Sequence, residues 1–358
     1  MARIDFSQVT YNGGQIEELS EIFFDAIFED PALEQFHTIV TGVQAKKQLV
    51  FMGEIGLSGK KQTNCDWDSN PGVIPQHEKE WSPEYIGDRF EECFADLLDT
   101  YFVWLGTGLK SGVDKPDLTN TSWSAFLEER VSRSAAEAVL RHAWLGNTAA
   151  ENVSDGGVIK DGVDIEYWNA IDGFWIQFVQ IGLANTKQRV VIAKNAAATY
   201  ELQQFDDTDV TNQVATGIFT KMIFAADMRL RRMTDRLIVS TQSLVDQYTL
   251  ERQAKNLDVP YDRVEEGMDT FKIQGVTIIP FDFLDRMITA YEDNGTKYNN
   301  PHRAVFTTKS NLQIGVENTS DLTELDPFYD KKDKRYYVDY AFNLDALVAR
   351  DYLSVVAY

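Results

Sequence analysis

A long polar stretch near the start of the chain is the feature that most limits how the chain can fold. Two strand-like segments, TIVTGV (38–43) and KQLVFM (47–52), precede the sequence GEIGLSGKKQTNCDWDSNPGVIPQ (53–76). This sequence is rich in Gly, Asn and Asp and has little apolar content, so it cannot form a core of its own. Loops longer than about 15 residues without secondary structure are usually functional. We therefore expect residues 38–80 to form an extended excursion that a partner covers.

The rest of the chain mixes helical and strand patterns, which predicts an α+β fold. Apolar residues at helical spacing predict helices at 16–28, 82–105 and 123–145, and Ser82-Pro83-Glu84 resembles a helix start. After a Gly-rich link we expect further helices and strands. The expected helices are 209–233, 243–257 and 283–291. The expected strands are 236–241, 303–308, 312–317, 335–343 and 352–358, and residues 271–280 are expected to form a strand pair or one bent strand.

Charge and apolar content exclude several classes of protein. The net charge of −22 opposes non-specific binding to nucleic acid and docking on an anionic membrane, because both depend on an excess of Lys and Arg. The sequence contains no run of about 18 apolar residues, so no membrane span is predicted. The first residues lack the apolar core of a signal peptide. Two isolated cysteines, Cys65 and Cys93, suggest a reducing compartment. We expect a protein that is made and kept in a cytoplasm.

Known catalytic and metal-binding patterns are weak or absent. The sequence GEIGLSGKK (53–61) resembles a phosphate-binding loop, but its spacing is wrong and Lys61 stands where Ser or Thr should be. The sequence GTGLKSG (106–112) lacks a preceding strand. The histidines are far apart in sequence and form no metal-ligand motif; they are His37, His77, His142 and His302. We expect no catalytic residue, no metal and no cofactor.

Taken in order, the parts of the chain resemble a tailed-bacteriophage major capsid protein of the Hong Kong 97-type fold. The N-terminal arm and Gly-bearing excursion come first, and the single long helix 123–145 resembles the spine helix of that family. Three later stretches continue the resemblance, namely IDGFWIQFVQ (171–180), GVTIIPFDFLDRM (275–287) and PHRAVFTTKSNLQIGVE (301–317). The end of the chain, residues 326–358, carries a charged hairpin tip, a paired strand and a final apolar strand.

This resemblance implies a division into parts. Residues 1–37 would be the N-terminal arm, and residues 38–80 the extended loop that lies over a neighbouring subunit. Residues 81–160 and 316–358 would form the peripheral domain, and residues 161–315 the axial domain. The contact residues implied between subunits are four lysines of the extended loop and the charged tip of the peripheral domain. They are Lys46, Lys47, Lys60, Lys61, Asp330, Lys331, Lys332, Asp333, Lys334 and Arg335.

The function implied is structural. The chain would assemble with itself into pentamers and hexamers of an icosahedral capsid that encloses double-stranded DNA without sequence-specific binding. Partners would include a portal and a separate scaffolding protein, since the arm is too short to hold a scaffolding domain, and decoration proteins stay an option. No membrane, cofactor or catalytic residue is expected. The protein would be part of the virion and would assemble in the cytoplasm of a bacterial host.

Two alternatives stay open. An encapsulin-type protein compartment has the same fold, and an enclosed cargo enzyme would distinguish it from a virus. A soluble α+β enzyme that uses the excursion as a lid belongs to a different class. Titratable side chains converging on one pocket would favour the enzyme.

Overall fold

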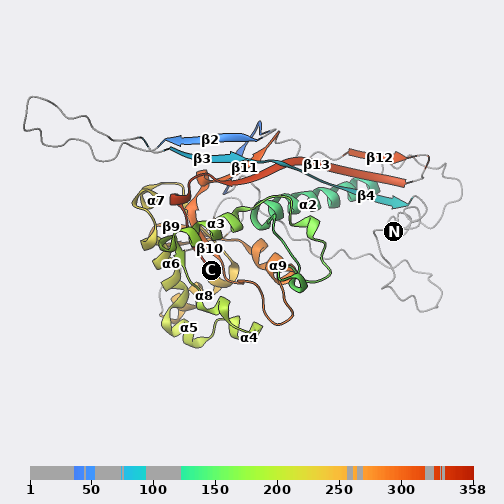
Figure 1. Ribbon diagram of the computed structural model, residues 1–358. Coiled ribbons are helices and arrows are strands. Elements are labelled where there is room, and N and C mark those ends of the chain that lie inside the picture. The colour runs from blue at the N-terminus through green and yellow to red at the C-terminus, as the bar shows by residue number, and fades with distance from the viewer. Residues whose placement is uncertain are drawn as a thin grey trace, which may run out of the picture.

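An elongated sheet runs along one side of the molecule, and a helix-rich body lies beneath it (Figure 1). The long helix α2 lies between the sheet and part of this body, as Figure 1 shows. The computed structural model describes residues 36–43, 46–52, 74, 76–93, 122–255, 261–263, 269–318, 326–330, 332 and 335–358.

The elongated sheet is built on one long strand, β13 (Arg335–Val348). On one side β13 pairs antiparallel with β4 (Glu84–Cys93) along ten consecutive residue pairs. On its other side it pairs with β12 (Asp326–Asp330) and β11 (Leu312–Val316), and β1 (Thr38–Val40) adds to β11 in parallel. The hairpin of β12 and β13 confirms the predicted paired strand and places the charged tip at its turn.

Helix α2 (Ser122–Leu145) confirms the predicted long helix and packs on β13. In its middle part the buried residues Val131, Ala135, Ala138 and Val139 follow the three-to-four spacing of one helix face. Residues 140–145 at its end are all buried. Helix α3 (Phe174–Ala184) packs against both α2 and β13. The main hydrophobic core therefore lies between these two helices and the elongated sheet, and it continues into the body.

The body is organised around a seven-stranded sheet with the order β5-β14-β10-β6-β9-β8-β7. Its strands are β5 (Arg189–Val190), β6 (Arg236–Ser240), β7 (Tyr261–Arg263), β8 (Asp269–Ile273), β9 (Val276–Pro280), β10 (Ala304–Thr308) and β14 (Val355–Ala357). Helices α4 (Tyr200–Gln203), α8 (Gln242–Ala254) and α9 (Asp282–Tyr291) belong to the same body. The strands and helices predicted between 236 and 317 are thus confirmed within one or a few residues.

The helix predicted at 82–105 is wrong for its first part, because residues 84–93 form strand β4. Exposure alternates along this strand: Ile86 and Phe90 pack on the core, whereas Tyr85 and Arg89 are exposed. Gly87 allows a close approach, since a Cβ there would lie 2.6 Å from the Tyr340 carbonyl oxygen. Pairing with β13 outweighs the local helical spacing, as tertiary contacts often do.

The single helix predicted at 209–233 is divided into three. Helix α5 (Asp207–Asn212) ends at Gln213, whose φ of 54° is left-handed. Helix α6 (Val214–Ala225) follows, and α7 (Met228–Arg232) begins after Asp227, whose side chain accepts a hydrogen bond from the Arg229 amide. These helix caps interrupt an apolar pattern that is continuous in sequence.

A two-stranded hairpin of β2 (Lys47–Met52) and β3 (Gln76–Trp81) extends beside the elongated sheet (Figure 1). The sequence predicts β2 but places residues 76–80 in the polar excursion, so β3 was missed. Its sequence, QHEKEW, holds one apolar residue, and only the pairing with β2 makes it a strand.

The domain division stays a prediction, and several strands pair across its proposed boundaries. Strand β14, from the stretch 316–358, lies between β5 and β10 of the seven-stranded sheet. Strand β1, from the stretch 38–80, belongs to the elongated sheet.

Several predictions fall outside the described residues. They concern residues 1–35 with the helix at 16–28, the glycine-rich sequences 53–61 and 106–112, and residues 94–105. Within the described part of the chain, none of the helices combines the length and the hydropathy that a membrane crossing requires.

Candidate assembly surfaces

The hairpin of β2 and β3 is fixed at its base by one buried tryptophan. Trp81, the last residue of β3, is 1% exposed and packs in a small cluster with Val43 and Leu347. Its ring lies against Gly315 of β11, where an added Cβ would lie 2.7 Å from Cζ3 of the indole. Only glycine leaves room for the ring at this position. The base of the hairpin is therefore fitted closely to the elongated sheet.

A buried carboxylate holds the corner at which β3 continues into β4. The Ser82 amide donates to Oδ2 of Asp345 at 2.6 Å, and the Ala346 amide donates to Oδ1 at 2.8 Å. Burial raises the pKa of Asp345 to about 6, although both amide hydrogen bonds oppose the rise. Because Asp345 belongs to β13, this contact ties the corner to the central strand.

Two contacts join the hairpin to the loop between β13 and β14. The Nζ atom of Lys79 lies 2.8 Å from Oδ1 of Asp351. The guanidinium of Arg350 lies 5.6 Å from the centre of the Phe51 ring, within the range of a cation–π interaction. Together with Trp81, these contacts set the direction in which the hairpin leaves the body.

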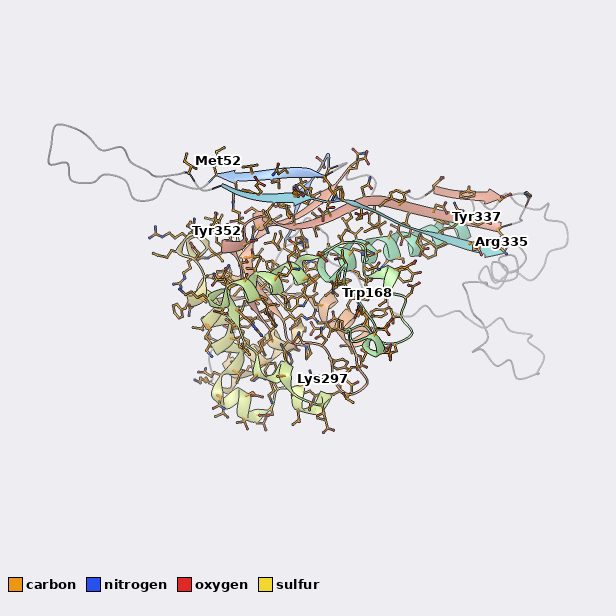
Figure 2. All side chains as sticks on the ribbon, viewed as in Figure 1. Met52, Trp168, Lys297, Arg335, Tyr337 and Tyr352 are labelled. Atoms are coloured by element: carbon orange, nitrogen blue, oxygen red, sulfur yellow. The ribbon has the colours of Figure 1, made fainter. Side chains whose placement is uncertain are left out.

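The opposite face of β2 is exposed and partly apolar. Gln48, Val50 and Met52 alternate with the inward residues of the strand, and Met52 is 72% exposed. Figure 2 shows Met52 at the end of the hairpin away from the long blade of β4, β12 and β13. An exposed apolar strand face of this kind suits a protein contact, since water solvates it poorly.

The blade of β4, β12 and β13 carries charged and aromatic side chains along its length. Arg89 forms a bidentate pair with Asp339, with Nε to Oδ1 at 2.8 Å, and lies 5.5 Å from the ring centre of Tyr337. Near the tip, Nη1 of Arg335 lies 2.7 Å from Oε1 of Glu91. Tyr85 is 74% exposed at the other end of β4. One face of the blade packs on the core, and its other side chains offer a long charged and aromatic surface.

The predicted contact residues lie at two separate places. Lys46 is exposed beside the base of the hairpin, and Lys47 begins β2 opposite Trp81, so neither is near the hairpin's far end. At the charged tip, Asp330 and Arg335 are paired in register, and Asp330 accepts a hydrogen bond from the Lys332 amide at 2.7 Å. The other predicted contacts, Lys60, Lys61, Lys331, Asp333 and Lys334, fall outside the described residues.

The start of the described chain is buried in the core, which the sequence reasoning missed. Phe36 is fully buried and packs edge-on against Phe281. The His37 Nε2 atom accepts a hydrogen bond from the Trp144 indole at 2.8 Å, and its ring stacks on Phe174. Within LEQF (33–36), the two apolar residues are the sequence signal for this contact. The described chain therefore begins at a firmly held point.

One pocket brings titratable groups together, the feature that would favour an enzyme. It has a volume of about 160 Å³ and is lined in part by Ser243, Asp285 and His302. Ser243 Oγ lies 2.8 Å from His302 Nδ1, and His302 Nε2 lies 2.8 Å from the Gln203 carbonyl oxygen. Burial lowers the pKa of His302, so a neutral ring with its proton on Nε2 fits both contacts.

The side chains of this pocket connect neighbouring segments of the body. The Asp285 carboxylate accepts the Gln242 amide at 2.6 Å at the start of α8, and burial raises its pKa to about 6. His302 is 5% exposed and links Ser243 to the chain at Gln203. The Asp285 carboxylate faces the amides at the start of α8, and the two ring nitrogens of His302 contact the Ser243 hydroxyl and the Gln203 carbonyl. The arrangement therefore lacks the base-orienting acid of a catalytic triad.

Metal-binding clusters are absent from the described residues, where no three His, Cys, Asp or Glu side chains gather suitably. His142 is buried on α2, and burial lowers its pKa to about 3, which keeps it neutral. Its environment is that of a core residue.

Comparison with known proteins gives the fold. Neither a protein-family model nor a curated protein sequence matches the chain. Among solved structures, the capsid of Myoviridae phage XM1 aligns with a TM-score of 0.52 and 12% identity, covering 96% of this chain and 99% of that one. A structure from Gordonia phage Cozz aligns with a TM-score of 0.50 and 9% identity, covering 98% and 91%. The chain therefore has the α+β fold of a tailed-phage capsid protein, as the resemblance in sequence predicts.

Proposed function

We propose that the chain is the major capsid protein of a tailed double-stranded DNA phage. It assembles with itself into pentamers and hexamers, and these form the icosahedral shell around the genome. The protein is a structural component of the virion and has no catalytic role. The likeness to the XM1 capsid over nearly the whole of both chains supports this proposal.

The observation that carries the proposal is the hairpin of β2 and β3. It leaves the body in a direction fixed by Trp81 and Asp345, while Val50 and Met52 face away from the protein. A rigid arm with an apolar outer face gains most when a second subunit covers it. We therefore assign the hairpin to the extended loop and the exposed face of β2 to a contact with a neighbouring subunit.

The remaining partners follow from the same proposal. A portal and a separate scaffolding protein would act during assembly in the bacterial cytoplasm, and decoration proteins would bind the finished shell. The net charge of −22 keeps the inner wall from holding DNA tightly, which would help packaging. The charged tip at Asp330 and Arg335 would meet its neighbours where three subunits approach one another.

The substitution Met52→Asp tests the hairpin contact. It should abolish particles in light scattering and sedimentation, because assembly would bury a carboxylate without a partner. Gln48→Asp is the matched control, since it adds the same charge on the same face of β2 without removing apolar surface. Circular dichroism checks that both variants fold. Particles formed equally by Met52→Asp and the wild type would contradict the assignment.

An encapsulin-type compartment is the alternative with the same fold. Its particles would enclose a cargo enzyme, whereas virions enclose DNA. Nuclease-protected DNA in particles from an infected host would favour the capsid proposal, and protected enzyme without DNA would favour the compartment.

A further inference from the structure

A basic and apolar surface lies where the body meets the hairpin. We call it the α7 corner and define it by Phe224, Met228, Arg229, Arg231, Arg232 and Tyr352. Phe224 is 61% exposed and Met228 is 69% exposed, so both offer apolar surface to a partner. Figure 2 labels Tyr352 below the hairpin that carries Met52.

The α7 corner is held in place by contacts of its own arginines. The Arg229 guanidinium lies 4.0 Å from the centre of the Tyr352 ring and pairs with Asp227 at 3.0 Å. Arg231 donates to the carbonyls of Phe224 and Ala226 at the end of α6, and its guanidinium lies 5.6 Å from the Phe224 ring. The rings and guanidinium groups are thus positioned before any partner binds, which lowers the entropy lost on binding.

The charge of this region is opposite to that of the whole chain. Residues 221–236, KMIFAADMRLRRMTDR, hold five Lys and Arg against two Asp, while the chain carries −22. Asp227 pairs with Arg229, and Asp235 accepts a hydrogen bond from Ser310 at 2.7 Å, so both acids are already engaged. An acidic partner with apolar side chains would complement this surface.

The chain itself contains such a partner in residues 16–30. Their sequence, IEELSEIFFDAIFED, has six carboxylates, no Lys or Arg, and apolar residues at helical spacing. We propose that the α7 corner binds this acidic segment of a second copy of the chain. The acids would face the arginines, and the apolar residues would cover Phe224 and Met228.

The position of Phe36 favours a second copy over the same copy. Only five residues separate position 30 from Phe36, which is buried against Trp144 and Phe281. Five residues span at most about 20 Å, which limits the distance between position 30 and that core. Phe281 immediately precedes α9, which lies near the middle of the body, whereas α7 lies at its left edge (Figure 1).

Photo-cross-linking of the full-length protein tests the proposal. Benzoylphenylalanine replaces Met228, and chains of natural isotope content are mixed with ¹⁵N-labelled chains before assembly and irradiation. Mass spectrometry should find residues 16–30 attached to position 228, with the two peptides carrying different labels. The cross-link should weaken in high salt, since exposed ion pairs are screened.

A charge reversal adds a matched comparison. Arg232→Glu should lower the cross-linking yield about fivefold, because it replaces attraction by repulsion at a partly solvated pair. Lys297→Glu reverses a charge far from α7, as Figure 2 shows, and should leave the yield unchanged.

Three results would overturn the inference: cross-links that avoid residues 16–30, cross-links confined to chains of one label, or equal losses from Arg232→Glu and Lys297→Glu. This contact between copies rests on the proposed capsid function. Particles that form without the cross-link would refute the contact and leave the capsid function standing, whereas a chain that stays monomeric would refute both.

Discussion

Gly315→Ala tests whether the fit between Trp81 and β11 fixes the hairpin. The new methyl carbon would lie 2.7 Å from Cζ3 and 2.8 Å from Cε3 of Trp81, where ordinary contacts begin at 3.4 Å. The indole ring must therefore move by about 0.7 Å, and β3 must move with it. Overpacking of a close-packed site lowers the free energy of unfolding by about 1–3 kcal/mol.

Urea unfolding measures the loss, and hydrogen exchange of the β2 and β3 amides should become faster. Trp81→Leu in the same chain should relieve the crowding, so the double variant should lose less stability than the sum of the two single variants. Gly217→Ala is the control without crowding, since a Cβ there meets nothing within 4 Å, and its place inside α6 should raise stability by about 0.5–1 kcal/mol. Unchanged stability and exchange in Gly315→Ala, or strict additivity with Trp81→Leu, would refute this reasoning.

Two further predictions concern buried polar groups. The pKa of Asp345 is raised to about 6, so the folded state binds a proton more tightly than the unfolded state and loses stability as pH rises from about 4 to 6. Asp345→Asn should remove that fall, seen by comparing urea unfolding of both proteins at pH 4 and pH 7; identical pH dependence would contradict it. Ser243→Ala should lower the free energy of unfolding by about 1–2 kcal/mol, because His302 Nδ1 loses its buried partner. Unchanged urea stability would contradict this role of the hydroxyl.

Local sequence patterns predicted the elements that lie within the body. In helix α2 and in strands β6, β10 and β11, the apolar residues recur at the spacing typical of a helix or of a buried strand. They do so because each element buries one face or both. The order of these parts also predicted the capsid fold, which no single motif marks. The sequence was informative wherever burial within one chain decided the structure.

The failures have a common physical cause. Strands β3 and β4 have few β-branched residues, and each exists because a distant strand pairs with it. Strand β4 pairs with residues more than 200 positions away, for example Glu84 with Leu344. A short stretch of sequence therefore cannot show that β4 is a strand. The packing of Trp81 on Gly315 and the hydrogen bond from Ser82 to Asp345 are equally remote in sequence.

Electron cryomicroscopy of the purified full-length protein tests the central claim most directly. The account predicts closed shells or capsomer rings in which the hairpin of β2 and β3 lies on a neighbouring subunit, with Met52 covered. A monodisperse monomer or dimer over a wide range of salt and protein concentration, with the hairpin packed on its own body, would contradict it.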